Sequence, residues 1–105
     1  MPDDPVREWV PIGDPELEVG RLTTVIAGGR AICVARTAAG YGALDNRCPH
    51  QGGPLGDGEL ENGFVVCPWH GYEYDLKTGQ CWGDSKLKLK KFEVVRRGDD
   101  IFVKV

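Results

Sequence analysis

Two short runs constrain this chain more than any other feature of its sequence: Cys48-Pro49-His50 and Cys67-Pro68-Trp69-His70. Each run offers one thiol and one imidazole, side chains that suit transition metals. Together the runs use both histidines of the 105-residue chain and two of its four cysteines. The sequence therefore predicts a fold that brings two separate loops to one metal site.

The size of the chain limits it to one domain. At 105 residues it has room for one modest hydrophobic core, and not for a second catalytic domain of ordinary size. We therefore expect a single domain over residues 1–105. The 15 glycines and 7 prolines are spread along the chain, which favours many short strands joined by turns.

The net charge indicates which partners the protein binds, and the first residues indicate where in the cell we expect it. The net charge of -3 argues against nucleic acid, because phosphate binding needs a concentrated basic surface. The acidic start, residues 1–5, lacks the basic and apolar segments of a signal peptide, and no stretch has the length to span a membrane. We expect a cytoplasmic protein, in which thiols stay reduced and bind metal more readily than they form disulfides.

Segments with strand character recur from end to end, and no helical period competes with them. They cover residues 8–12, 21–27, 30–36, 41–46, 63–67, 73–76, 92–96 and 101–105. Residues 27–30 and 97–100 contain the glycines typical of tight hairpin turns. The sequence predicts an all-β fold. Because the ligand runs fall in the middle, strands from both ends should pair into a base that carries an inserted lobe over about residues 46–83.

Prolines and glycines beside the ligand runs fit loops that wrap an inorganic cluster. Pro49 and Pro68 stiffen the backbone. Gly52, Gly53 and Gly71 allow a close approach because they have no Cβ. Backbone amides left free in such loops can point at sulfur, and these hydrogen bonds raise a reduction potential by stabilising the added electron.

The two runs and the residues that flank them resemble the cluster-binding loops of Rieske-type [2Fe-2S] ferredoxins. The pattern of that family is C-x-H and then, roughly sixteen residues later, C-x-x-H. The resemblance extends through residues 48–58 and 67–79 to the final hairpin of residues 92–103, and it covers about residues 7–105. It implies an antiparallel β-sandwich base with an inserted cluster-binding lobe of two loops.

The resemblance also implies one Rieske-type [2Fe-2S] cluster and assigns its four ligands. Cys48 and Cys67 would hold the inner iron, and His50 and His70 would hold the outer iron through Nδ1. Two imidazoles in place of two thiolates leave the oxidised centre neutral, so it accepts an electron more readily than an all-Cys cluster. The same four residues also suit tetrahedral zinc, although zinc modules usually space their ligands differently.

Three positions depart from the high-potential respiratory branch of the family. Gly53 and Trp69 stand where that branch carries two further cysteines joined in a disulfide. Tyr72 replaces a serine whose hydroxyl bonds a bridging sulfide, whereas Tyr74 keeps the aromatic position near a ligand cysteine and remains able to donate to it. We therefore predict a potential in the lower half of the Rieske range, which runs from roughly -150 to +300 mV.

The other unusual residues have simpler interpretations. Cys33 lies in an apolar strand-like run and Cys81 lacks the spacing of a ligand, so both are predicted to pack as small hydrophobic side chains. Trp69 either packs under the lobe or lies on a docking surface, and Trp82 is a candidate cover for the cluster. In residues 86–91 lysines alternate with leucines, the pattern of a half-buried strand with a basic solvent face.

Nothing outside the ligand runs predicts catalysis. Both histidines are committed to the cluster, and no nucleophile–base pair or phosphate-binding loop remains. The resemblance implies an electron carrier, not itself an enzyme, which takes one electron at a time from a flavin-dependent reductase to a terminal oxygenase of the aromatic-ring-hydroxylating type. The alternative is a fixed small Rieske subunit of a larger reductase, such as NAD(P)H-dependent nitrite reductase.

Overall fold

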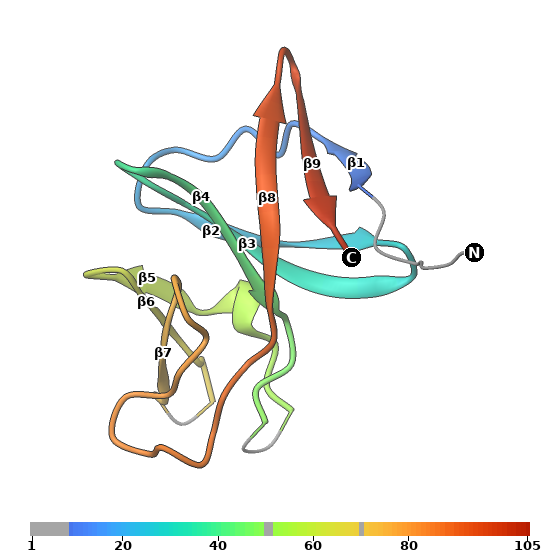
Figure 1. The fold of residues 1–105 in the computed structure, drawn as a ribbon. Helices are drawn as coiled ribbons and strands as arrows, with labels where there is room; N and C mark the ends of the chain where they lie inside the picture. The colour runs from blue at the N-terminus through green and yellow to red at the C-terminus, as the bar shows by residue number, and fades with distance from the viewer. Residues whose placement is uncertain (1–8, 50–51, 70) are drawn as a thin grey trace.

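The computed structural model describes residues 9–49, 52–69 and 71–105. Its base is a six-stranded antiparallel sheet with the strand order β1-β9-β8-β4-β3-β2. The base strands are β1 (Trp9–Gly13), β2 (Leu22–Ala27), β3 (Arg30–Thr37), β4 (Gly40–Asp45), β8 (Lys91–Arg97) and β9 (Asp100–Lys104). The segment between β4 and β8 forms a lobe beside this base (Figure 1). The prediction of an all-β base built from both ends of the chain is confirmed.

The base closes over a hydrophobic core of its own. β4 and β8 share only two residue pairs, Ala43 with Phe92 and Leu44 with Lys91, so the sheet folds there into the two layers of a sandwich (Figure 1). Side chains from both layers meet in the base core, whose buried members are Leu17, Ala27, Ile32, Val34, Ala43, Phe92 and Val103. Burial of such a cluster is the main force that holds the two layers together.

Strand β3 is buried on both faces, which explains its unbroken apolar run. Ile32 and Val34 point into the base core, whereas Cys33 and Ala35 point into a second cluster on the opposite face. This second cluster joins the base to the lobe. Its buried members are Cys33, Ala35, Leu44, Cys48, Leu55, Val65, Cys67, Tyr74, Leu76, Cys81 and Leu89.

The lobe has its own three-stranded antiparallel sheet in the order β5-β6-β7. Its elements are the 3-10 helix η1 (Leu55–Asp57), β5 (Glu59–Glu61), β6 (Phe64–Val66) and β7 (Glu73–Asp75). One face of this sheet packs Leu60, Val65 and Tyr74 against the second cluster. Because side chains alternate along each strand, the opposite face carries the acidic residues of the sheet, which are Glu59, Glu61, Glu73 and Asp75.

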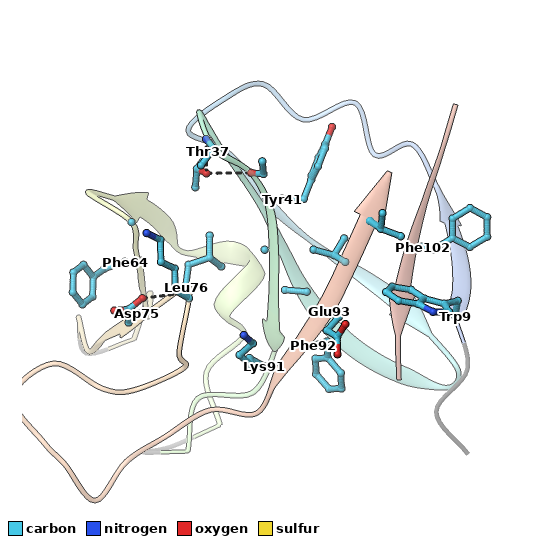
Figure 2. Close-up of a pocket in the computed structure, with 18 of the residues that line it drawn as sticks. Trp9, Thr37, Tyr41, Phe64, Asp75, Leu76, Lys91, Phe92, Glu93 and Phe102 are labelled. Atoms are coloured by element: carbon cyan, nitrogen blue, oxygen red, sulfur yellow. Dashed lines mark hydrogen bonds between the residues drawn. The ribbon is translucent and has the colours of Figure 1, made fainter. Parts of the chain in front are cut away.

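A groove of about 1040 Å³ separates the lobe from the C-terminal hairpin of the base (Figure 2). Trp9 and Phe102 line its base side, and Phe64 lines its lobe side. Beside the groove, Leu76 of the lobe lies directly on Gly42 of β4, where a Cβ would come within 2.6 Å of the leucine Cγ. Glycine at position 42 therefore lets the lobe sit on the base without a gap.

Each of the eight predicted segments overlaps a strand of the structure, but the lobe differs from prediction in two ways. The sequence pattern does not predict η1 or β5. The predicted strand over residues 86–91 is wrong for most of its length, because β8 begins only at Lys91 and residues 86–90 form a turn and a single bridge between Gln80 and Lys88. The alternation itself holds, since the leucines pack against the second cluster while the lysines are exposed.

The part of the chain that the structure describes contains no helix with the length and apolar character that a membrane crossing needs.

Candidate metal centre

The first ligand loop closes on itself through backbone hydrogen bonds. The Leu55 N–H donates to the Asn46 carbonyl (2.7 Å), and the Cys48 N–H donates to the Gly53 carbonyl (2.9 Å). The Gly52 N–H donates back to the Cys48 carbonyl (2.6 Å). Gly52 has a φ of +80°, which glycine adopts without strain. Both backbone polar groups of Cys48 are thus fixed by its own loop.

The second ligand loop repeats this turn at the same offsets. The Cys67 N–H donates to the carbonyl of Tyr72, five residues on (2.8 Å), and the Gly71 N–H donates to the carbonyl of Cys67, four residues back (3.0 Å). Gly71 has a φ of +75°, close to that of its counterpart in the first loop. The two cysteines are therefore held by the same pair of backbone hydrogen bonds.

The two loops meet at Gly53. A Cβ placed there would lie 2.9 Å from Sγ of Cys67 and 3.1 Å from two ring atoms of Trp69. The structure thus brings together the two positions, Gly53 and Trp69, at which the respiratory branch carries its extra cysteines. Trp69 contacts Gly53 and still exposes 55% of its surface, so it is partly packed and partly on the surface.

The side chain of Tyr74 lies next to Cys48, the first of the two predicted thiol ligands. Its Oη is 3.1 Å from Sγ of Cys48, within hydrogen-bond distance, and its side chain is fully buried. Burial raises the pKa of Tyr74, and the hydrogen bond with Cys48 raises it further, so the hydroxyl keeps its proton. The structure therefore confirms that Tyr74 reaches Cys48, and a protonated phenol can donate to a sulfur at this distance.

The predicted ligand set is described only in part. Cys48 and Cys67 both lie in the second cluster, at 1% and 3% exposure, which brings the two predicted thiol ligands into one buried region. His50 and His70 lie outside the described residues, so their role as ligands stays a prediction. The donor chemistry of these two buried thiols, together with the close approach of the two loops at Gly53, fits a [2Fe-2S] cluster.

The other two cysteines are buried, as predicted. All four cysteines belong to the described residues, and none is joined in a disulfide. Burial raises the pKa of the Cys33 thiol to about 12, and burial followed by the charge of Asp84 raises that of Cys81. The expected cover by Trp82 is wrong, because 73% of this side chain is exposed.

Asn46 is a site residue that sequence reasoning missed. It is the buried polar residue of the described chain, and its Oδ1 accepts hydrogen bonds from the Gly56 N–H (2.7 Å) and the Thr24 hydroxyl (3.1 Å). These bonds tie the first ligand loop to β2 of the base. An asparagine between the end of a strand and the first ligand run is the sequence signal, but its partner Thr24 is far away in sequence.

The outer face of the lobe sheet is strongly negative. A hydrogen bond with Glu59 and the charge of Glu59 raise the pKa of Glu61, and Glu73 on β7 adds to the effect. Such a rise shows that the carboxylates stand close enough to repel one another. The negative face lies on the side of the sheet opposite Tyr74 and the ligand cysteines.

The profile of the Rieske [2Fe-2S] domain matches residues 8–93. The chain belongs to the Rieske [2Fe-2S] domain family. The resemblance seen in the sequence is confirmed, and so is the cofactor, because Rieske domains bind a [2Fe-2S] cluster through mixed Cys and His ligation. The zinc alternative is set aside.

Curated relatives carry the Rieske domain within longer chains. Human apoptosis-inducing factor 3 is 33% identical over 90 residues, which cover 85% of this chain and 15% of that protein. The oxygenase component of dicamba O-demethylase from Stenotrophomonas maltophilia is 39% identical over 69 residues, which cover 58% of this chain and 20% of that protein. The chain therefore spans a small part of the length of these relatives.

Solved Rieske structures share the fold. The ferredoxin of carbazole 1,9a-dioxygenase from Nocardioides aromaticivorans IC177 has a TM-score of 0.81 at 24% identity, over 94% of this chain and 97% of that chain. A chain in the complex of reduced oxygenase and oxidized ferredoxin in carbazole 1,9a-dioxygenase has a TM-score of 0.78 at 22% identity, over 91% and 92%. A protein assigned as the small subunit of an NADH-dependent nitrite reductase from Mycobacterium tuberculosis has a TM-score of 0.87 at 19% identity, over 96% and 97%.

Proposed function

We propose that Cys48, His50, Cys67 and His70 hold one [2Fe-2S] cluster, and that the chain works as a one-electron carrier. The observation that carries the proposal is the repeated pair of backbone hydrogen bonds, which holds two buried cysteines of a Rieske domain in the same way. When bound, a cluster with this ligand set gains and loses one electron at a mild potential.

The residues around the cysteines control how readily an electron is held. The Tyr74 hydroxyl lies 3.1 Å from the Cys48 sulfur. Once Cys48 binds iron as a thiolate, this hydroxyl is the donor, and it stabilises the additional negative charge of the reduced state. The hydrophobic second cluster excludes water from both sulfurs, which opposes that charge. Without the respiratory disulfide and its serine hydroxyl, the balance favours a potential in the lower half of the Rieske range, below about +75 mV.

The partners we propose are a flavin-dependent reductase as donor and a terminal oxygenase of the aromatic-ring-hydroxylating type as acceptor. Support comes from the ferredoxin of carbazole 1,9a-dioxygenase, which this chain matches over nearly its whole length, and from the oxygenase components among the relatives. The chain itself then transforms no substrate. A cytoplasmic location fits this role.

The cluster assignment is tested by spectroscopy and protein-film voltammetry on the purified protein. We expect the visible absorbance and reduced-state EPR signal of a Rieske centre. His50→Cys should retain some cluster and shift its potential from the Rieske range toward the value of about -400 mV typical of all-Cys clusters. Cys81→Ala is the matched control and should keep the wild-type potential. An unchanged potential in His50→Cys would contradict the ligand assignment, and a wild-type value above about +75 mV would contradict the predicted lower half of the range.

A second candidate role is that of a fixed small subunit in a larger reductase. The likeness to the protein assigned as an NADH-dependent nitrite reductase small subunit, which extends over 96% of this chain, favours it. Native purification from the source cells separates the two roles. A free carrier elutes alone at the size of this chain, whereas a subunit elutes with a flavin-containing partner and with nitrite-reducing activity.

A further inference from the structure

Three cationic side chains gather where the base meets the first ligand loop. Arg30 and Lys90 lie over the ring of Phe92, with Cζ and Nζ at 5.6 and 5.3 Å from its centroid. Arg47 extends over Gly52 of the loop, with its Nε 3.2 Å from the position that a Cβ there would occupy. We call Arg30, Arg47 and Lys90 the basic patch.

The fold places these residues side by side although they are far apart in sequence. Arg30 begins β3, Arg47 follows β4, and Lys90 precedes β8, and these three strands are neighbours in the sheet. The Asp45 N–H donates to the Lys90 carbonyl (2.9 Å), which fixes the two chain segments next to each other. Arg30, Asp45 and Arg47 line one shallow hollow that also includes Gly52. The patch is therefore continuous with the first ligand loop.

The charge of the basic patch is not balanced by its surroundings. Its three side chains are exposed, and within the described ranges the structure places no carboxylate in ion-pair contact with them. Asp45 is the acid in the hollow, and its Oδ1 accepts the backbone N–H of Arg47. Three cations against one acid give a local excess of positive charge in a chain whose net charge is -3. An exposed excess of this kind attracts a partner of the opposite sign.

We propose that the basic patch docks an acidic surface on a redox partner of this chain and so seats that partner against the first ligand loop. The inference rests on the proposed electron-carrier function. Attraction between the patch and an acidic surface speeds encounter, and the position of Arg47 beside Cys48 directs the encounter to the loop that carries the cluster ligands. The acidic outer face of the lobe sheet would repel the same partner and so disfavour docking there.

The test compares one charge reversal in the patch with the same reversal far from it. Lys90→Glu changes the patch, whereas Arg97→Glu changes the exposed end of β8 at the distal hairpin, which lies away from the lobe (Figure 1). Electron transfer from the dithionite-reduced protein is followed by stopped flow with acidic cytochrome b5 as the acceptor. At about 10 mM ionic strength we expect Lys90→Glu to slow transfer roughly fivefold and Arg97→Glu to slow it less than twofold. Near 1 M salt the difference should vanish, since the screening length falls to about 3 Å.

Further measurements separate a docking role from other effects of the substitution. Arg47→Gln, which removes charge without reversing it, should slow transfer about twofold in the same assay. With basic cytochrome c the order should invert, so that Lys90→Glu transfers faster than Arg97→Glu. Potentials and melting curves of all variants are measured alongside, so that a change in driving force or in folding is separated from a change in encounter rate.

Equal rates for Lys90→Glu and Arg97→Glu with cytochrome b5 would overturn the proposal, because only net charge would then matter. A wild-type protein without a Rieske spectrum, or one that reduces neither cytochrome, would instead contradict the proposed electron-carrier function. The two failures are therefore distinguishable.

Discussion

The base is built from strands of five to eight residues, whereas each strand of the lobe has only three. The base strands pair in continuous ladders around a core of their own. The lobe is ordered by turns, by glycines in close contact and by two cysteine loops that meet at one place. The comparison teaches that the base is organised by long strand ladders around a core of its own, while the lobe is organised by turns and by its packing on the second cluster.

The largest expected contrast is between two buried cysteines, one in each part of the molecule. Cys67→Ala should abolish the visible absorbance of the cluster, because one of the two predicted thiolate ligands is lost. Cys33→Ala in β3 should keep the full absorbance and lower the free energy of unfolding by about 1 kcal/mol, the cost of removing one small buried group. Absorbance and urea unfolding of both variants measure the contrast. Full cluster content in Cys67→Ala would sink the ligand assignment.

Removal of iron should loosen the lobe and spare the base. With the cluster chelated out, we expect amide hydrogen exchange in residues 52–69 to rise about a hundredfold, because the lobe loses the group that its loops hold. Exchange in β2 and β3, which are paired over six residues, should change less than about threefold. Exchange followed by mass spectrometry gives both values. Uniform change across the chain would mean that base and lobe unfold as one unit.

Substitution of one glycine in the lobe and one in the base compares how tightly the two parts are packed. A Cβ on Gly58 would overlap the Val66 carbonyl oxygen and approach Pro68, so Gly58→Ala should lower the free energy of unfolding by about 3 kcal/mol. Gly98 in the β8–β9 turn has open space around it and a φ of +62°, so Gly98→Ala should cost only about 1 kcal/mol. Chemical denaturation of the holoprotein compares them. Equal losses would show that close packing is no tighter in the lobe than at the edge of the base.

Substitution of one tyrosine in the lobe and one in the base tests which part of the molecule sets the reduction potential. Tyr74→Phe removes the donor to Cys48 and should lower the reduction potential by about 50 mV, because a hydrogen bond worth about 1 kcal/mol more in the reduced state is lost. Tyr41→Phe in β4 removes an acceptor of the Arg96 guanidinium, on the base, and should leave the potential unchanged. Protein-film voltammetry distinguishes the two. A potential that rises in Tyr74→Phe would reverse the proposed direction of this bond.

The smallest expected effect is the pH dependence contributed by Cys33. Its pKa is raised by burial from 9.0 to about 12, so the folded protein keeps this proton after the unfolded chain has released it. Its contribution to stability is complete below pH 9 and is lost as the pH rises toward 12, by about 1 kcal/mol between pH 9 and 10. Cys33→Ala should flatten that part of the curve of unfolding free energy against pH.

Turns and candidate ligands could be predicted from the sequence, because short runs of residues specify them. Contacts between segments far apart in the chain could not be predicted. Glycines mark the turns, with two at residues 28–29 and one at Gly98, and short Cys/His runs mark Cys48 and Cys67. β5 carries one apolar residue between two glutamates, too short a pattern to signal a strand. The contact of Gly42 with Leu76 depends on three-dimensional packing that spacing along the chain does not encode.

The hydrogen bond between Asp45 and Lys90 has a consequence for how such a protein can change over evolutionary time. The chain leaves one sheet strand and returns on the adjacent one, so residues 46–89 begin and end at neighbouring points. If another segment, or a tight turn, replaced this insert, the pairing between β4 and β8 would remain. The residues of the metal centre therefore lie on an insert that enters and leaves the scaffold at one point, and a new insert would also have to cover Cys33, Ala35 and Leu44 of the base.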